Sequence, residues 1–401
     1  MDISRLSSGR DVGHALAEAQ RADIAPFIVM DVMRAAAARE ASGGRVVHME
    51  VGQPATSAPL AARQRVMAAL DTENLGYTVA LGMPELRARV AGLYKSWYGL
   101  DIDPGRIVIT SGSSAAFVLT FMTLFDVGTT VGLPSPGYPC YRHILTALGV
   151  GSHLIETTAG NRWMPTAEQI GQAATAHKLS GLLLASPNNP TGTMLSPQRL
   201  AEVVAMCRDR GLWFISDEIY HGLTWGVEQD TALRYSPDAI VINSFSKYFS
   251  MTGWRVGWMV VPERLVRTVE RLAQNLYICP PTIAQVAALG AFDGMDELEG
   301  NRRVYAANRD MLLAEFPKAG LSKIVPADGA FYLYVDVGDY TSDSLAFTKL
   351  MLEETGVAAT PGLDFDPARG GRYVRFSYAG ATSEMAEAVL RLKAWSRLRP
   401  G

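Results

Sequence analysis

The chain has 401 residues, which is too long for one simple hydrophobic core and predicts two domains, or one large domain with a smaller one attached. Its composition, 48% hydrophobic and 19% charged, is that of an ordinary globular protein, and the formal charge of −3 gives no basic surplus for nucleic acid or an anionic membrane. The three cysteines, Cys140, Cys207 and Cys279, are far apart, which excludes a disulfide scaffold and argues against a zinc site.

The sequence shows no targeting segment and no membrane span. Charged residues stand near the N-terminus, where a signal peptide has an apolar core, and no run approaches the ~20 apolar residues of a membrane span. We therefore expect a cytoplasmic protein that binds no membrane, no nucleic acid and no metal.

The N-terminal part predicts a lead-in and an arm. Residues 1–20 are polar and form the lead-in. Residues 26–40, PFIVMDVMRAAAARE, have the apolar spacing of a helix, and VVHMEVGQPATSAP predicts a short strand followed by a Gly/Pro-rich loop. We assign residues 21–56 to an arm that forms the N-terminal part of the smaller domain.

Apolar runs alternate with helical stretches between about residues 60 and 295. Runs of β-forming residues without polar alternation are typical of strands that are buried on both faces, and their alternation with helices predicts βαβ units. We therefore expect an α/β fold in which residues 57–295 form a large domain, with helices flanking a mostly parallel central sheet. The five runs are RIVITSGSS, TTVGLPSPGYP, GLLLASPNNPTG, LWFISDEIY and AIVINSFSK.

The pattern changes in residues 296–401, which predict a smaller α+β domain. A long helical segment comes first, then the two alternating strands GAFYLYVDV and RYVRFSYA, and then the closing helix SEMAEAVLRLKAWSRL.

Polar and ionisable residues stand at the ends of the five runs. Ligands of open α/β sheets bind outside the carboxyl ends of the strands, so these residues are expected to meet in one crevice. The sequence contains no G-x-x-x-x-G-K-[ST], H-E-x-x-H or G-x-G-x-x-G, so a nucleotide, zinc-protease or dinucleotide site lacks its signature. The residues at the run ends are Ser113 and Ser114, Tyr138, Asn189, Asp217 and Tyr220, and Lys247.

The set of motifs resembles that of the fold-type I pyridoxal-phosphate enzymes, specifically the class I/II aminotransferases. The resemblance extends from about residue 20 to the C-terminus and rests on YTVALGMPELR, PSPGYPCY, PNNPTG, DEIY, SFSKYFSMTGWRVGW and RYVRFSYA, which follow the family's order. It implies an amino-acid:2-oxo-acid aminotransferase that uses pyridoxal 5′-phosphate in ping-pong transamination through a lysine Schiff base.

The resemblance assigns catalytic roles to Lys247, Asp217 and Tyr220. Lys247 would form the Schiff base and then move the proton of the substrate Cα, which requires a lowered amine pKa. Asp217 ends an apolar strand, where a carboxylate is costly unless it is paired, and would pair with the protonated pyridine nitrogen. Tyr220 and Asn189 would hydrogen-bond the phenolate oxygen of the cofactor.

Further residues are assigned to the cofactor. Tyr138 would stack on the pyridine ring. Tyr77 would reach the phosphate bound by the neighbouring subunit, which implies a homodimer with shared active sites. The phosphate in its own subunit would be held by a helix N-terminus and by hydroxyl and guanidinium groups, from Ser113, Ser114, Ala115, Ser244, Ser246 and Arg255.

Three residues are assigned to the substrate. Strand alternation puts Arg375 on the face opposite Val374, so that Arg375 is free to hold the α-carboxylate. Gly52 matches the position where the family's backbone approaches that carboxylate, and Asn189 also lies at the substrate.

The sequence does not predict the substrate side chain, because no second arginine can be assigned to a distal carboxylate. We expect residues 24–27, IAPF, to supply an apolar lid, and the segment Met30 to Met33 to belong to core packing.

Two other functions remain open at this point. A pyridoxal-phosphate-dependent β-lyase acting on cysteine conjugates such as cystathionine would use the same Lys247, Asp217 and Arg375, so no motif separates it from a transaminase. A non-catalytic cofactor-binding regulatory module is disfavoured because the aminotransferase pattern begins near residue 20, which leaves no room for an added DNA-binding domain.

Overall fold

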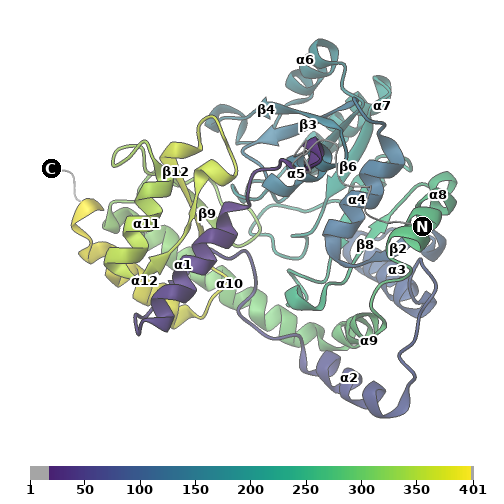
Figure 1. The fold of residues 1–401 in the computed structure, drawn as a ribbon, viewed down its shortest axis with the longest axis horizontal. Coiled ribbons are helices and arrows are strands. Elements are labelled where there is room, and N and C mark those ends of the chain that lie inside the picture. The colour runs from purple at the N-terminus through teal and green to yellow at the C-terminus, as the bar shows by residue number, and fades with distance from the viewer. Residues whose placement is uncertain (1–17, 399–401) are drawn as a thin grey trace, which may run out of the picture.

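The computed structural model describes residues 18–398, and a seven-stranded sheet forms the centre of the larger part of the molecule (Figure 1). Its pairs are parallel except those of β8, which runs antiparallel to both of its neighbours. The prediction of an α/β fold with a mostly parallel central sheet is confirmed. Across the sheet, the strands are β2 (Ile107–Thr110), β8 (Gly257–Val260), β7 (Ile240–Ser244), β6 (Trp213–Asp217), β5 (Gly181–Ala185), β3 (Thr130–Ser135) and β4 (Gly151–Glu156).

Helices cover this sheet, and successive residues of its strands pack into two different cores. In β5, Leu182 and Leu184 belong to one hydrophobic cluster, whereas Leu183 belongs to another. Burial on both faces explains why the predicted strands are continuously apolar. The helices of this part are α2 (Leu60–Thr72), α3 (Pro84–Tyr98), α4 (Gly112–Leu124), α5 (Pro139–Ala147), α6 (Ala167–His177), α7 (Pro197–Asp209), α8 (Glu263–Leu276) and α9 (Thr282–Ala291).

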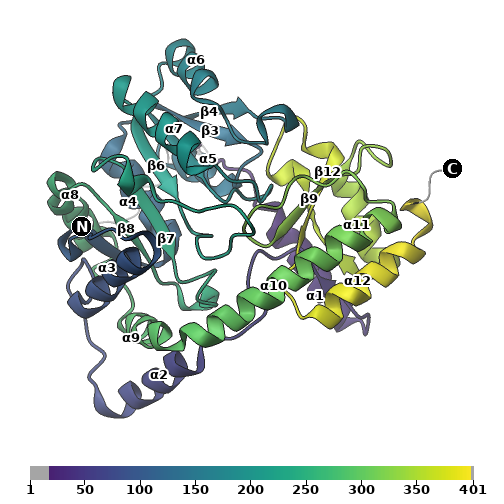
Figure 2. The same cartoon turned by 180° about the vertical axis from the view of Figure 1, so that it is seen from behind.

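A second, smaller part contains an antiparallel sheet and three helices from the end of the chain. The long helix α10 leads into it from α9, as Figure 2 shows. No described helix is both long and apolar enough to cross a lipid bilayer. The elements are α10 (Met295–Glu315), β9 (Tyr332–Asp336), α11 (Ser344–Thr355), β10 (Val357–Ala358), β11 (Thr360–Pro361), β12 (Tyr373–Ser377) and α12 (Thr382–Ala394).

The N-terminal helix α1 (Ile28–Ala41) lies with this smaller part (Figure 1). It packs beside β10 and β11, and the strand that follows it, β1 (Val47–His48), pairs in parallel with β10. Within the predicted lead-in, residues 1–17 lie outside the described residues. The domain boundaries at residues 20, 56 and 295 stay predictions.

The two-sided burial of the central strands predicts a clear stability difference between two valines. Val241 in β7 is fully buried, whereas Val127 is 80% exposed. Val241→Ala removes two buried carbons and leaves a cavity, so it should lower the free energy of unfolding by about 2 kcal/mol. The matched change Val127→Ala should cost less than about 0.5 kcal/mol. Urea unfolding of both variants measures the difference, and equal midpoints would contradict the packing described.

Candidate active site

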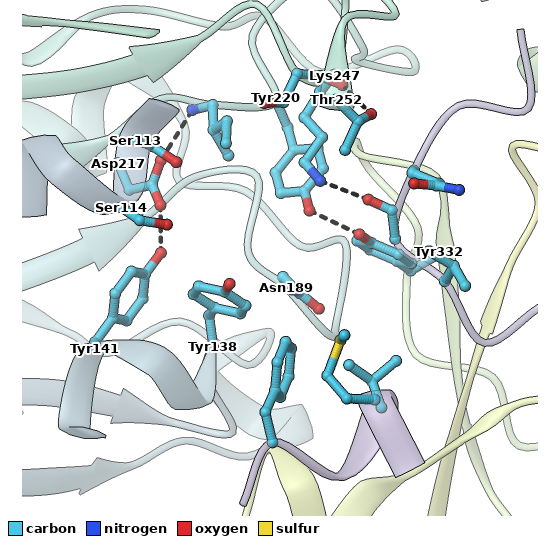
Figure 3. Close-up of a pocket in the computed structure, with 18 of the residues that line it drawn as sticks. Ser113, Ser114, Tyr138, Tyr141, Asn189, Asp217, Tyr220, Lys247, Thr252 and Tyr332 are labelled. Atoms are coloured by element: carbon cyan, nitrogen blue, oxygen red, sulfur yellow. Dashed lines mark hydrogen bonds between the residues drawn. The ribbon is translucent and has the colours of Figure 1, made fainter. Parts of the chain in front are cut away.

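One cavity of about 620 Å³ lies at the carboxyl ends of the central strands, between the two parts of the molecule (Figure 3). Its wall combines residues from the ends of β2, β3, β5, β6 and β7 with residues from the loop after β1 and from β9 and β12. The predicted site residues that line it are Gly52, Ser113, Ser114, Tyr138, Asn189, Asp217, Tyr220, Ser246, Lys247, Arg255 and Arg375.

Three predicted residues lie outside the wall of this cavity. Ser244 is buried behind Ser246, and the two hydroxyl oxygens are 2.8 Å apart and hydrogen-bonded. Ala115 is buried in the first turn of α4. Tyr77 is 84% exposed and does not line the cavity of its own chain.

Lys247 follows β7 and points its amine into the cavity (Figure 3). The amine donates a hydrogen bond to the carbonyl oxygen of Gly52 and lies 5.7 Å from the centre of the Tyr220 ring. Burial lowers the pKa of Lys247 to about 7; the charges of Arg375 and Arg255 lower it further, and Asp217 opposes the decrease. A substantial fraction of this amine is therefore uncharged near neutral pH and able to act as a nucleophile or base.

Asp217 is the last residue of β6 and is 3% exposed. Its carboxylate accepts hydrogen bonds from the Tyr141 hydroxyl and, at 3.0 Å, from the backbone N–H of Ile219. Burial raises the pKa of Asp217 to about 6, while these two donors and the charge of Lys247 hold it down. With this pKa most of the Asp217 carboxyl is ionised at pH 7, which gives this part of the cavity wall a negative charge.

Arg375 enters from β12, where Val374 and Phe376 face the hydrophobic core. Its guanidinium donates to Asn189 Oδ1 at 2.9 Å and to the carbonyl oxygen of Glu50, and it lies 4.4 Å from the centre of the Tyr332 ring. The Nε atom is buried and has no hydrogen-bond partner among the described residues. A buried cation with a free donor suits a carboxylate ligand.

Groups that attract an anion line the cavity where α4 begins. Gly112 opens this helix with a φ of +74°, and a Cβ there would lie 2.4 Å from a guanidinium nitrogen of Arg255. Glycine therefore lets Arg255 approach the free N–H groups of the first turn, next to Ser113 and Ser114. The helix dipole, the guanidinium and the hydroxyls together favour an anionic group such as a phosphate.

Sequence reasoning missed two tyrosines of the cavity. Tyr141 hydrogen-bonds Asp217, and the hydroxyl of Tyr332 is 2.7 Å from that of Tyr220 (Figure 3). Tyr141 lies in the first turn of α5, which directly follows Tyr138 at the N-cap position, and the two ring centres are 5.2 Å apart. Tyr332 carried a weaker signal, since only the pairing of β9 with β12 puts it on the face of Arg375.

The first turns of α1 form an apolar wall of the cavity. Phe27, Val29, Met30 and Met33 line it, and Met30 is 53% exposed. The expectation that Met30 to Met33 belongs to core packing is therefore wrong for Met30 and Met33, whereas Val32 between them packs against a buried cluster. An apolar helix face predicts burial, but the sequence does not tell whether a core or a cavity lies opposite.

Comparison with known proteins gives consistent matches over nearly the whole chain. A family model described as aminotransferase class I and II matches residues 45–392. The valine–pyruvate aminotransferase of Mycobacterium tuberculosis is 46% identical over 94% of this chain and 98% of its own length. A crystal structure of a putative aminotransferase from Silicibacter pomeroyi matches with a TM-score of 0.89 at 51% identity, over 94% and 99% of the two chains. The aspartate aminotransferase of Thermus thermophilus with maleate also gives a TM-score of 0.89, at 28% identity over 94% and 99%.

The lowered pKa of Lys247 predicts selective reactivity of its amine. An amine reacts with acylating and arylating reagents only when uncharged, so modification of the ligand-free protein by trinitrobenzenesulfonate should rise from pH 6 to 8 with its midpoint near pH 7. An unperturbed lysine would give a midpoint near 10. Mass spectrometry of the peptide that contains Lys247 gives the rate, and Lys247→Arg is the control. A midpoint near 10 would contradict the burial of the amine.

Proposed function

The chain belongs to the class I and II aminotransferase family, and we propose that it transfers the amino group of an apolar α-amino acid to a 2-oxo acid, using pyridoxal 5′-phosphate. One observation carries this proposal: a single cavity holds the amine of Lys247, the carboxylate of Asp217 and the guanidinium of Arg375 against an apolar wall. The cytoplasmic location predicted from the sequence is part of the same proposal.

The residues of the cavity fit pyridoxal phosphate. Its phosphate needs an anion site, which the start of α4 and Arg255 supply around Gly112. Its ring nitrogen needs an acidic partner, for which Asp217 is buried and ionised. Its carbonyl carbon needs an amine of lowered pKa, which Lys247 provides. Tyr138, Asn189 and Tyr220 would complete the contacts with the ring.

When bound, pyridoxal phosphate supplies an electron sink for the substrate Cα and carries the amino group between the two half-reactions. Lys247 would hold the cofactor and then accept the proton that leaves Cα of the bound amino acid. A pKa of about 7 suits this exchange, because the amine can both take up and return a proton near neutral pH. Asp217 would keep the ring nitrogen protonated, and Arg375 would hold the α-carboxylate through its planar fork.

The apolar wall indicates the class of substrate. Among the residues that line the cavity, Lys247, Arg255 and Arg375 are the basic ones, and each already has an assigned partner. Within the part of the wall that this chain supplies, a distal carboxylate would be buried without a counter-charge, which costs several kcal/mol. A branched aliphatic side chain would instead gain about 0.8 kcal/mol for each buried methylene. The similarity to a valine–pyruvate aminotransferase favours the same class.

We also propose a homodimer in which Tyr77 serves the active site of the partner subunit. Tyr77 is 84% exposed, so its side chain is accessible to a second molecule. Its loop is fixed nevertheless, because Thr282 Oγ1 donates to the carbonyl oxygen of Gly76 and Gln285 Nε2 donates to Thr78 Oγ1 at 3.1 Å. A rigid loop that presents an exposed tyrosine suits a contact with a second copy of the chain.

The proposal is tested by a half-reaction. The cofactor-loaded enzyme is mixed with L-valine in the absence of any 2-oxo acid, and the release of 3-methyl-2-oxobutanoate is measured. We expect about one product per site, and a rate with L-aspartate about 100-fold lower because of its unpaired carboxylate. Lys247→Ala should lower the valine rate at least about 1000-fold, since it removes the base.

The control variant for this experiment is Lys349→Ala, whose side chain is 76% exposed and does not line the cavity. It should keep the rate of the unmodified enzyme. Ammonia release from L-cystathionine, without 3-methyl-2-oxobutanoate from L-valine, would contradict transamination and favour a β-lyase.

The role of Tyr77 predicts a change in cofactor affinity with no change in assembly. Tyr77→Phe removes the hydroxyl that would bond the phosphate of the partner subunit. Hydrogen bonds to charged groups contribute about 1.5–3 kcal/mol, so the dissociation constant of pyridoxal phosphate should rise about tenfold or more. Sedimentation should give a dimer for both proteins. A monomer, or an unchanged dissociation constant, would contradict the proposed role.

A further inference from the structure

The apolar wall of the cavity is built on the start of α1, and this helix start lacks a cap of its own. We name residues 27–33 the wall segment. Phe27 is the residue at the N-cap position, and its side chain has no oxygen that could accept hydrogen bonds from the first free N–H groups of the helix. The wall segment therefore depends on another part of the chain to satisfy these donors.

Asp364 supplies the missing acceptor from the opposite end of the sequence. Its carboxylate accepts a hydrogen bond from the backbone N–H of Ile28 at 3.1 Å through Oδ1, and one from that of Val29 at 3.3 Å through Oδ2. The side chain is 1% exposed and lies 336 positions from Ile28. Burial raises the pKa of Asp364, while the two N–H groups, Arg375 and Arg142 oppose that increase.

The segment around Asp364 also contacts α5 and Arg375, which lie on two sides of the cavity wall. Asp364 ends a short turn, Gly362–Asp364, and its carbonyl oxygen accepts a hydrogen bond from Arg142 of α5 at 2.8 Å. The next residue, Phe365, stacks against the guanidinium of Arg375, 4.8 Å from the ring centre. One short segment thus contacts the wall segment, the helix that follows Tyr138, and the arginine assigned to the substrate carboxylate.

The wall segment also contacts Tyr138, the residue that precedes α5. The ring of Phe27 packs edge-on against that of Tyr138, with 5.8 Å between the ring centres. Val29 is buried, while Met30 is half-exposed at the mouth of the cavity. The position of these side chains relative to Arg375 therefore depends on where the first turn of α1 lies.

We propose that Asp364 is a positioning residue that fixes the wall segment at the distance from Arg375 required by a branched apolar side chain, and so sets the affinity for such substrates. This inference rests on the proposed function for its choice of substrate. The proposal requires that Asp364 change the affinity for the substrate side chain beyond Cβ. It also requires that the affinity for the α-carboxylate stay unchanged.

The first experiment measures the helix start directly. Hydrogen–deuterium exchange of the complete, cofactor-loaded protein is followed in the peptide that contains residues 28–33. Asp364→Asn keeps the size of the side chain but removes its charge and one acceptor, so exchange should become about tenfold faster, as expected for loss of a charged hydrogen bond. Unchanged exchange would overturn the proposal.

The matched control is Asp366→Asn, two residues further along. Asp366 is also buried, but it accepts from the N–H groups of Ala368 and Arg369 and has no hydrogen bond with α1. Exchange of residues 28–33 should stay as in the unmodified protein. An equal acceleration in this control would show a general loosening of the segment and would overturn the specific role of Asp364.

The second experiment measures affinity without turnover. Isovalerate and acetate are both carboxylates, but only isovalerate has a branched apolar end that reaches the wall segment. In Asp364→Asn the dissociation constant of isovalerate, measured by equilibrium titration of the cofactor-loaded protein, should rise about tenfold, and that of acetate less than twofold. An equal rise of both constants would mean that Asp364 acts on Arg375 through Phe365, and the proposal would fail.

A second variant keeps the test valid if Asp364→Asn folds poorly. Ile28→Pro removes one of the two N–H donors and leaves Asp364 intact, and proline is well tolerated at the first position of a helix. It should raise the isovalerate constant about threefold and leave the acetate constant unchanged. If the enzyme fails to transaminate L-valine but these exchange and affinity changes occur, the proposed function fails and the positioning role stands.

Discussion

Burial of the ionisable groups Asp217, Lys247 and Arg375 in one cavity is the constraint on which the rest of the structure depends. Each group is costly in a low-dielectric environment, and each changes the proton affinity of another: Asp217 raises the pKa of Lys247, and Arg375 lowers it. Because β6, β7 and β12 supply one group each, the cavity can exist only where the central sheet and the smaller sheet meet. Because β6 and β7 are parallel, Asp217 and Lys247 lie at the same edge of the central sheet.

The same constraint explains what the sequence could predict of the fold. The five apolar runs became β2, β3, β5, β6 and β7, since burial on both faces leaves a recognisable pattern. Two strands of the central sheet were not predicted. β4 is an edge strand with the sequence GSHLIE and mostly unburied residues, so it lacks that pattern, and β8 has only the residues GWMV within a conspicuous motif.

The sequence predicts those site residues that stand at the carboxyl end of a parallel strand. Residues at strand ends, such as Asp217 and Lys247, meet because parallel strands end at one edge. The sequence does not predict contacts between residues that are far apart in the chain and belong to different elements of the fold. The hydrogen bond between Tyr220 and Tyr332 and the cap that Asp364 gives to Ile28 belong to this second class.

The pairing of the two chain ends has a consequence for protein synthesis. Residues 112–255 include the groups proposed to hold the phosphate and Lys247, and they leave the ribosome before the smaller C-terminal part of the chain. The hydrogen bond that caps the helix start at Ile28 forms only after Asp364 has been synthesised, 336 residues later, and Arg375 follows Asp364. A nascent chain therefore has the groups proposed to hold the phosphate long before it has those proposed to select an amino acid. A chain that terminated before Asp364 would carry the groups proposed for the cofactor but would lack both Asp364 and Arg375, which are proposed to act on the substrate.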